Sequence, residues 1–250
     1  MSDIIHPWYQ LGYIIPHLTT DMDAYQFYRI APEGMMLVTP CLDLQGHSLE
    51  AIEREMPTFW RHVDLLAKKK VDRISLSGVP VGSYLGREKM RATLKEASER
   101  AGMVVDTDIE AHVAVMQHLG ATKIAMATRW PDSTVTRLTR YMNDSGIEVL
   151  STKSQAMNFK ESKERKAEDD HNLALDLGRQ ALREAPQAQA LLMPGGLWHA
   201  MHAVSILEQE FGVPVLLNIT STTWAALHAA GPERIKVRPN PHWGMMFKSL

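Results

Sequence analysis

The chain is poor in cysteine, with Cys41 as the single thiol among its 250 residues. A lone cysteine cannot form an intrachain disulfide, and disulfide-free chains are typical of the reducing cytoplasm. The N-terminal residues have neither the basic region nor the apolar core of a signal peptide. No apolar run approaches the roughly 20 residues of a membrane-spanning helix. We therefore expect a cytoplasmic protein without a membrane partner.

The sequence also lacks an excess of charge of either sign, with 27 Lys and Arg against 29 Asp and Glu. Nucleic-acid binding depends on clustered basic side chains, so we expect no nucleic-acid partner. The phosphate-binding motifs GxGxxG and Walker A are absent, and so are the metal-ligand pairs HExxH and CxxC. We predict no cofactor and no metal. The residues that still leave a metal site conceivable are His17, Glu110, His199 and His242.

What the sequence does have is a regular alternation of short apolar segments and longer segments with helical periodicity, in a chain that is 45% hydrophobic. Strands are predicted at 11–15, 35–39, 73–77, 103–106, 123–128, 148–150, 190–193 and 213–218. Helices are predicted at 48–70, 88–101, 109–119, 133–144, 169–184, 200–211 and 221–230. Such alternation is typical of parallel sheets covered by helices on both faces, so the fold class is α/β.

The two halves of the chain repeat one pattern, a strand that runs into a glycine turn. Residues 74–78 (ISLSG) in the first half match residues 191–195 (LLMPG) in the second. We predict two pseudo-symmetric α/β lobes with a cleft between them, the first formed by 1–118 with the tail 225–250, the second by 119–224. Ligands of parallel sheets bind beyond the carboxyl ends of the strands, so the candidate site residues are those that follow the strands.

Residues 151–171 differ from the rest because acidic and basic side chains are mixed along them. A solvated helix face or loop accounts for this composition. A flap over the cleft accounts for it as well, and both interpretations stay open.

Four motifs keep their order and spacing over essentially the whole chain. They are GYIIP at 12–16, SLSGVPVGSYLG at 75–86, LGATKIAMAT at 119–128 and LLMPGGL at 191–197. The chain resembles the aspartate/glutamate racemase superfamily, and within it the arylmalonate decarboxylase and maleate isomerase branch. The resemblance implies two pseudo-symmetric lobes with the active site between them. It also implies cofactor-free proton transfer at a carbon next to the carboxylate of a small organic acid.

The catalytic cysteines of that family are missing here. Their positions fall on Gly78 in the first lobe and Pro194 in the second, so a two-thiol racemase is excluded. Pro80 and Pro194 have no backbone N–H, which removes two donors from an anion cradle. Cys41 matches neither position, and we expect it to be a buried, inert thiol.

The resemblance also implies a set of substrate-binding residues around the cleft. Glycine backbones can approach a ligand closely, and Trp130 stands where the family has a carboxylate-binding tyrosine. Hydroxyl groups at 218–223 can bind a carboxylate or merely cap a helix. Arg129 can pair with an anion or lie on the surface. The implied binding residues are Gly78, Val79, Trp130, Gly195, Gly196 and Thr222.

A histidine or a glutamate with a shifted pKa can replace a thiol as proton donor or acceptor near neutral pH. We predict Glu110, His199 and His17 as the catalytic candidates, because each follows a strand or a glycine turn that faces the cleft. His47 and His242 are held in reserve, and Asp108 is expected to cap the helix that begins near it.

Three functions remain open from the sequence. The first is a cofactor-independent lyase or isomerase that transfers a proton beside a carboxylate. The second is a hydrolase in which Glu110 or a histidine activates water while glycine N–H groups of the cleft stabilise an oxyanion. The third is a non-catalytic protein that binds small carboxylates. A homo-oligomer is compatible with each of them.

Overall fold

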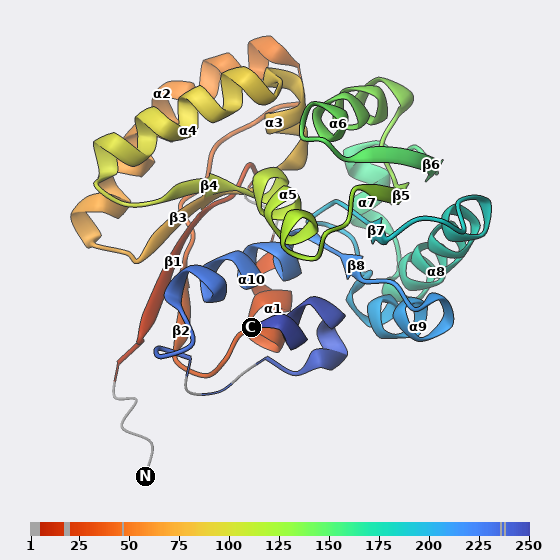
Figure 1. Cartoon of the computed structure of the whole chain (residues 1–250). Coiled ribbons are helices and arrows are strands. Elements are labelled where there is room, and N and C mark those ends of the chain that lie inside the picture. The colour runs from red at the N-terminus through yellow and green to blue at the C-terminus, as the bar shows by residue number, and fades with distance from the viewer. Residues whose placement is uncertain (1–5, 18–20, 47, 236, 238) are drawn as a thin grey trace.

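Two four-stranded parallel sheets form the centre of the molecule (Figure 1). A computed structural model of the chain describes residues 6–17, 21–46, 48–235, 237 and 239–250. The first sheet has the strand order β2-β1-β3-β4 and the second the order β6-β5-β7-β8. The predicted α/β class with two similar lobes is confirmed.

The first lobe contains the elements from β1 to α5. Its strands are β1 (Tyr9–Ile14), β2 (Met35–Val38), β3 (Arg73–Leu76) and β4 (Val105–Thr107). Its helices are α1 (Asp21–Ile30), α2 (Leu49–Lys69), α3 (Val79–Leu85), α4 (Arg87–Ala101) and α5 (Asp108–His118). Helices α2 and α4 cover the outer face of the sheet in Figure 1, while α5 lies on the side toward the second lobe.

The second lobe repeats this alternation. Its strands are β5 (Lys123–Thr128), β6 (Glu148–Ser154), β7 (Ala190–Leu192) and β8 (Val215–Leu216). Its helices are α6 (Asp132–Asp144), α7 (Phe159–Glu164), α8 (Ala167–Glu184), α9 (Met201–Phe211) and α10 (Asn218–Ala230). Two short 3-10 helices, η1 (Pro241–Trp243) and η2 (Met245–Ser249), follow near the C-terminus.

Helix α10 packs against α5 and α1, which belong to the other lobe, and α3 packs against α6 (Figure 1). The boundary predicted between 224 and 225 falls inside α10, and the assignment of domains stays a prediction. Buried apolar side chains run from the first sheet through α10 into the second sheet without a break. None of the helices formed by the described residues is long and apolar enough to cross a membrane.

Several segments differ from the sequence-based expectation. Helices α1, α3 and α7 were not predicted, and residues 218–223, expected in part as strand and turn, are the start of α10. Gly78 begins α3 with a backbone φ of 106°, a conformation that favours glycine. The expectation that Asp108 caps α5 is wrong, because the Thr107 side chain is the cap and accepts a hydrogen bond from the Glu110 N–H.

Candidate active site between the two sheets

A pocket of about 520 Å³ lies at the carboxyl ends of the strands of both sheets. In the first sheet β1, β3 and β4 end at one edge, since Ile14 pairs with Leu76 and Leu76 pairs with Thr107. In the second sheet Leu192 pairs with Leu216 in the same parallel manner. The lining segments include 16–17, 44–46 and 77–80 from the first lobe and 129–131, 157–158 and 194–197 from the second. Both predicted glycine turns therefore reach the same pocket.

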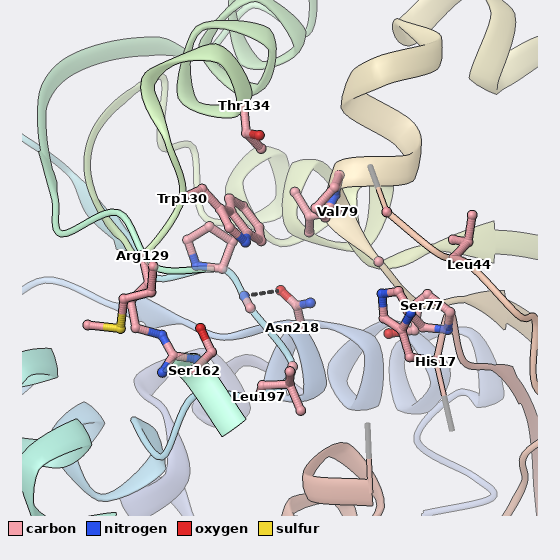
Figure 2. Close-up of a pocket in the computed structure, with 18 of the residues that line it drawn as sticks. His17, Leu44, Ser77, Val79, Arg129, Trp130, Thr134, Ser162, Leu197 and Asn218 are labelled. Carbon is pink, nitrogen blue, oxygen red and sulfur yellow. Dashed lines mark hydrogen bonds between the residues drawn. The ribbon is translucent and has the colours of Figure 1, made fainter. Parts of the chain in front are cut away.

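Among the described lining residues, His17 and Arg129 carry the ionisable nitrogen groups, and Cys, Asp, Glu and Lys are absent. Figure 2 shows His17 and Arg129 on opposite sides of the pocket, with Asn218 between them. Burial lowers the pKa of His17 below the ordinary histidine value, partly offset by a hydrogen bond with the Leu44 backbone and by the Asp43 carboxylate. His17 is therefore a neutral imidazole at neutral pH, with one donor and one acceptor nitrogen.

A buried polar cluster lies behind the first-lobe wall of the pocket. The Tyr13 hydroxyl lies 3.1 Å from Asp23 Oδ2, 3.0 Å from Ser77 Oγ and 3.2 Å from both carboxylate oxygens of Asp108. Ser77 Oγ lies 3.2 Å from Asp23 Oδ2, and Ser77 itself lines the pocket. All four side chains are buried. The two carboxyl groups thus share one phenol, and Asp23 connects to the pocket through Ser77.

The two carboxyl groups differ in their hydrogen-bond donors. Besides Tyr13, Asp108 accepts hydrogen bonds from the Gly78 N–H (3.1 Å), Asn218 Nδ2 (3.1 Å) and Thr222 Oγ1 (2.7 Å). Burial raises the pKa of Asp108, but these donors oppose the shift. Burial and the nearby Asp108 carboxylate raise the pKa of Asp23 to about 7. The pair can therefore hold one proton near neutral pH, as coupled carboxyl groups do.

Asn218 fixes the floor of the pocket between the lobes. Its Oδ1 accepts hydrogen bonds from the Gly195 N–H at 3.1 Å (dashed in Figure 2) and from His112 Nε2 at 3.1 Å. The other His112 nitrogen, Nδ1, lies 2.9 Å from Ser221 Oγ. Burial lowers the pKa of His112 to about 4, so this imidazole stays neutral. The amide is held from both ends, because Nδ2 donates to Asp108.

The second-lobe side of the pocket is basic. Arg129 Nη1 donates to Asp170 Oδ1 at 2.7 Å, and Arg165 Nε donates to the same oxygen at 3.1 Å. The backbone N–H of His199 and its Nδ1 both lie near Asp170 Oδ2, at 3.0 and 3.1 Å. The Arg129 guanidinium also lies over the Trp198 ring, 5.2 Å from its centroid. One buried carboxylate thus anchors two guanidinium groups, and positive charge remains beside the pocket.

The segment 151–171 takes part in this site. Met157, Asn158 and Ser162 line the pocket, and Asn158 caps α7 through a reciprocal hydrogen-bond pair with Glu161. The charged residues Lys160, Glu161 and Glu164 of this segment are exposed. One side of the segment is therefore solvated while other residues form pocket wall, and its action as a flap stays a prediction.

The predicted binding residues gather at the pocket more completely than the predicted catalytic ones. Gly78, Val79, Trp130, Gly195 and Gly196 line it, and so does His17. Thr222 does not line the pocket and instead donates to Asp108 behind it.

Two of the three catalytic candidates lie outside the lining. The Glu110 carboxylate accepts a hydrogen bond from the Tyr141 hydroxyl at 2.6 Å and faces Arg87 Nε at 3.4 Å. His199 is turned to Asp170 and reaches the pocket only through the Asp170–Arg129 pair. The assignment of catalytic residues stays a prediction, and the structure favours His17 by position.

The expectation that glycine N–H groups of the cleft are free for an oxyanion is wrong for two of them. The Gly78 N–H donates to Asp108 and the Gly195 N–H donates to Asn218. Because each N–H already has a protein acceptor, neither is available to an anionic intermediate without a rearrangement. This removes one support for the hydrolase alternative.

Cys41 is absent from the lining of the pocket, although Ile15 and Cys41 form a bridge at the end of β1. Burial raises the pKa of its thiol, whose Sγ lies 2.8 Å from the Leu42 carbonyl oxygen. His47 lies outside the described residues. His242 is exposed and packs edge-on against Trp243. Within the described ranges no three His, Cys, Asp or Glu side chains are grouped so as to hold a metal ion.

Sequence reasoning missed Asp23, Tyr13 and Ser77. The available signal was the position of two hydroxyl side chains: Tyr13 lies near the carboxyl end of β1 and Ser77 directly after β3, where both strands are buried. Asp23 had no such signal, since α1 itself was not predicted. An added Cβ on Gly196 would lie 2.5 Å from Asp23 Oδ2, so the absence of a side chain there lets the Asp23 carboxyl approach the second-lobe turn.

Comparison with known proteins agrees with this architecture. The model of the arylmalonate decarboxylase family matches residues 11–238. Arylmalonate decarboxylase of Bordetella bronchiseptica is 24% identical over 186 residues, which make up 74% of this chain and 75% of that protein. A crystal structure of arylmalonate decarboxylase is 22% identical, has a TM-score of 0.79, and covers 96% of this chain and 99% of its own.

A second solved relative is a maleate cis-trans isomerase mutant of Nocardia farcinica with a covalently bound succinylcysteine intermediate. It is 16% identical, has a TM-score of 0.80, and covers 97% of this chain and 99% of its own. Structures at this sequence distance show a shared two-lobe fold. Because the family match extends over most of the sequence, this chain belongs to the arylmalonate decarboxylase family, in the racemase-superfamily branch that the four motifs predicted.

Proposed function

We propose that the protein is a cofactor-independent lyase or isomerase that moves a proton at the carbon beside a carboxylate of a small organic acid. The observation that carries the proposal is the pocket between the two sheets, with a neutral imidazole on one side and a guanidinium on the other. The family, whose named relatives are a decarboxylase and an isomerase, supports the same reaction class.

We propose that Arg129 binds a substrate carboxylate. Its guanidinium lines the pocket and keeps donors beyond the Nη1–Asp170 hydrogen bond, since a guanidinium has five N–H groups. Asp170 fixes its position, and Arg165 and His199 fix Asp170 in turn. His199 is thus a positioning residue for the anion site. A charge-assisted hydrogen bond of this kind contributes about 1.5–3 kcal/mol.

We propose that His17 contacts the reacting carbon or the carboxylate attached to it. In an isomerisation its imidazole accepts the proton that leaves the carbon. In a decarboxylation its N–H stabilises the enediolate that remains after carbon dioxide departs. Apolar side chains, among them Leu44, Val79, Trp130 and Leu197, make up much of the remaining wall. The substrate we propose is therefore a carboxylate with an apolar or aromatic portion.

Product analysis tests the proposal. The protein is incubated in D2O with 2-aryl- and 2-alkyl-malonates, maleate and simple monoesters, and the products are analysed by mass spectrometry and NMR. Release of carbon dioxide with one deuteron on carbon identifies a decarboxylase. An unchanged acid skeleton with altered configuration identifies an isomerase. A gain of one water identifies a hydrolase and contradicts the proposal, as does binding of these acids without any conversion.

A further inference from the structure

We propose that Asp23 is the proton donor of this enzyme and that it delivers its proton to the substrate carbon through the Ser77 hydroxyl. The inference rests on the proposed function and names the group that replaces the missing thiols. It assigns a catalytic part to Ser77, which lines the pocket, and a proton-storing part to Asp23, which lies behind it.

The geometry connects Asp23 to the pocket at two points. Asp23 Oδ2 lies 3.2 Å from Ser77 Oγ, a hydrogen-bond distance. The same carboxyl group lies close to Gly196, another lining residue. A Cβ added to Gly196 would lie 2.5 Å from Oδ2 and 2.8 Å from Oδ1 of Asp23. Asp23 therefore lies directly behind the part of the pocket wall that Ser77 of the first lobe and Gly196 of the second lobe form.

The number of donors decides which carboxyl group of the pair holds the proton. Asp108 receives three hydrogen bonds from Gly78, Asn218 and Thr222 in addition to Tyr13, and it begins α5, where a negative charge is favoured. The hydrogen-bond donors to Asp23 among the described residues are Tyr13 and Ser77, and its Oδ1 is buried without a hydrogen-bond partner. A buried oxygen without a donor fits a neutral carboxylic acid better than a carboxylate.

The groups that face Asp23 from each packed element are few. They are Tyr13 on β1, Ser77 after β3, Asp108 on α5 and the backbone at Gly196. No Lys, Arg or His of the described residues forms a hydrogen bond or ion pair with it. Among the described residues the charge that acts on Asp23 is the negative Asp108 carboxylate, so Asp23 keeps its proton up to a pH of about 7.

The delivery step balances for a decarboxylation. The bond between the α-carbon and the departing carboxylate breaks, carbon dioxide leaves, and the electron pair stays on the α-carbon as an enediolate. Ser77 donates its hydroxyl proton to that carbon while it takes the Asp23 proton on Oγ. Asp23 ends as a carboxylate and regains one proton from water, which matches the one proton that the overall reaction consumes.

The experiment combines infrared spectroscopy with pH profiles of two variants. In the wild-type protein carbonyl bands of protonated carboxyl groups are expected at neutral pH, and the band that Asp23 contributes should disappear in Asp23→Asn but persist in Ser77→Ala. On a substrate found by the product analysis, both variants should lower kcat by about 10²–10⁴-fold, the usual contribution of a positioned acid. In the wild-type protein kcat/KM should fall above a pH of about 7, and the Asp23→Asn variant should lose this limb.

Glu208 provides a matched control, because it is another buried carboxyl whose pKa is raised to about 7 but it does not line the pocket. Glu208→Gln should remove its own infrared band and leave the pH profile of kcat/KM unchanged. An active wild-type protein with unchanged rates in both Asp23→Asn and Ser77→Ala overturns the relay alone. A wild-type protein that converts none of the acids overturns the proposed function, and the delivery step with it.

Discussion

The two walls of the pocket repeat one fold but carry opposite electrostatics. On the first-lobe side, Asp23 and Asp108 are buried together, and no cation of the described residues pairs with either of them. On the second-lobe side, one buried carboxylate, Asp170, is shared by Arg129 and Arg165. Asp108 follows β4 and Arg129 follows β5, so both sets reach the pocket at strand ends. The first-lobe set is a pair of acids, while the second-lobe set carries two guanidinium groups on one carboxylate.

This asymmetry suggests how a member of a thiol-dependent superfamily can dispense with thiols. Two cysteines on equivalent turns form a symmetric arrangement, in which either side can donate or accept a proton. In the mechanism we propose, the first-lobe side supplies the proton and the second-lobe side binds the anion, so a single direction of proton delivery is favoured. The predictions below remove one side at a time.

The largest effect is expected from His17→Ala, which removes the imidazole from the pocket. The rate should fall by about 10²–10⁴-fold while far-UV circular dichroism stays unchanged. Because burial lowers the pKa of His17, the acid limb of the wild-type kcat/KM profile should lie below the ordinary histidine range and vanish in the variant. A variant that keeps both the rate and the acid limb would show that His17 does not act in the reaction.

Asp170→Ala should cause the next largest effect, this time on stability. The substitution leaves the buried Arg129 guanidinium without its partner, and breaking a buried pair in this way costs about 3–5 kcal/mol. Urea unfolding measures the loss. Asp64→Ala, which breaks the exposed pair with Arg100, is the control and should change little. Equal changes in the two variants would remove the distinction between the buried anchor and a surface ion pair.

Arg129→Lys should weaken substrate binding without abolishing proton transfer. A lysine keeps the charge but loses the planar fork that can hold both Asp170 and a carboxylate. KM should rise by roughly 10- to 100-fold with a smaller change in kcat, in line with the loss of a charge-assisted hydrogen bond. A large fall in kcat at constant KM would instead show that Arg129 acts in proton transfer and not in substrate binding.

The sequence predicted the framework of this site better than its chemistry. The glycine turns at 78 and 195 and the lobes that carry them follow from strand periodicity and from the four motifs. The buried polar cluster does not follow from the sequence, because its members come from four separate parts of the chain and meet only in the folded protein. They are Tyr13, Asp23, Ser77 and Asp108. Glu110 and His199 show the reverse case, since they follow strand ends but their side chains are bound to Tyr141 and Asp170 instead.

Glu208→Gln sharpens the comparison between a buried carboxyl that reaches the pocket and one that does not. Glu208 accepts hydrogen bonds from the Val215 and Met245 N–H groups, and burial raises its pKa to about 7. The folded state thus holds a proton that the unfolded state has lost, so stability should decline from the ordinary Glu range up to pH 7. The contribution of Glu208 to the slope is about 1 kcal/mol per pH unit, and Glu208→Gln should remove that contribution and leave the one from Asp23 in urea unfolding at several pH values.

The smallest effect is expected from Cys41→Ser, which tests whether either wall uses a thiol at all. Cys41 does not line the pocket, its Sγ is directed to the Leu42 carbonyl oxygen, and burial raises the pKa of the thiol and so suppresses the reactive thiolate. Serine keeps the size and the donor, so kcat and KM should stay within about twofold. Stoichiometric inactivation of the wild-type protein by a thiol reagent, prevented by substrate, would contradict this. It would place a nucleophile on the first-lobe side, where the structure has a neutral histidine and a pair of buried acids.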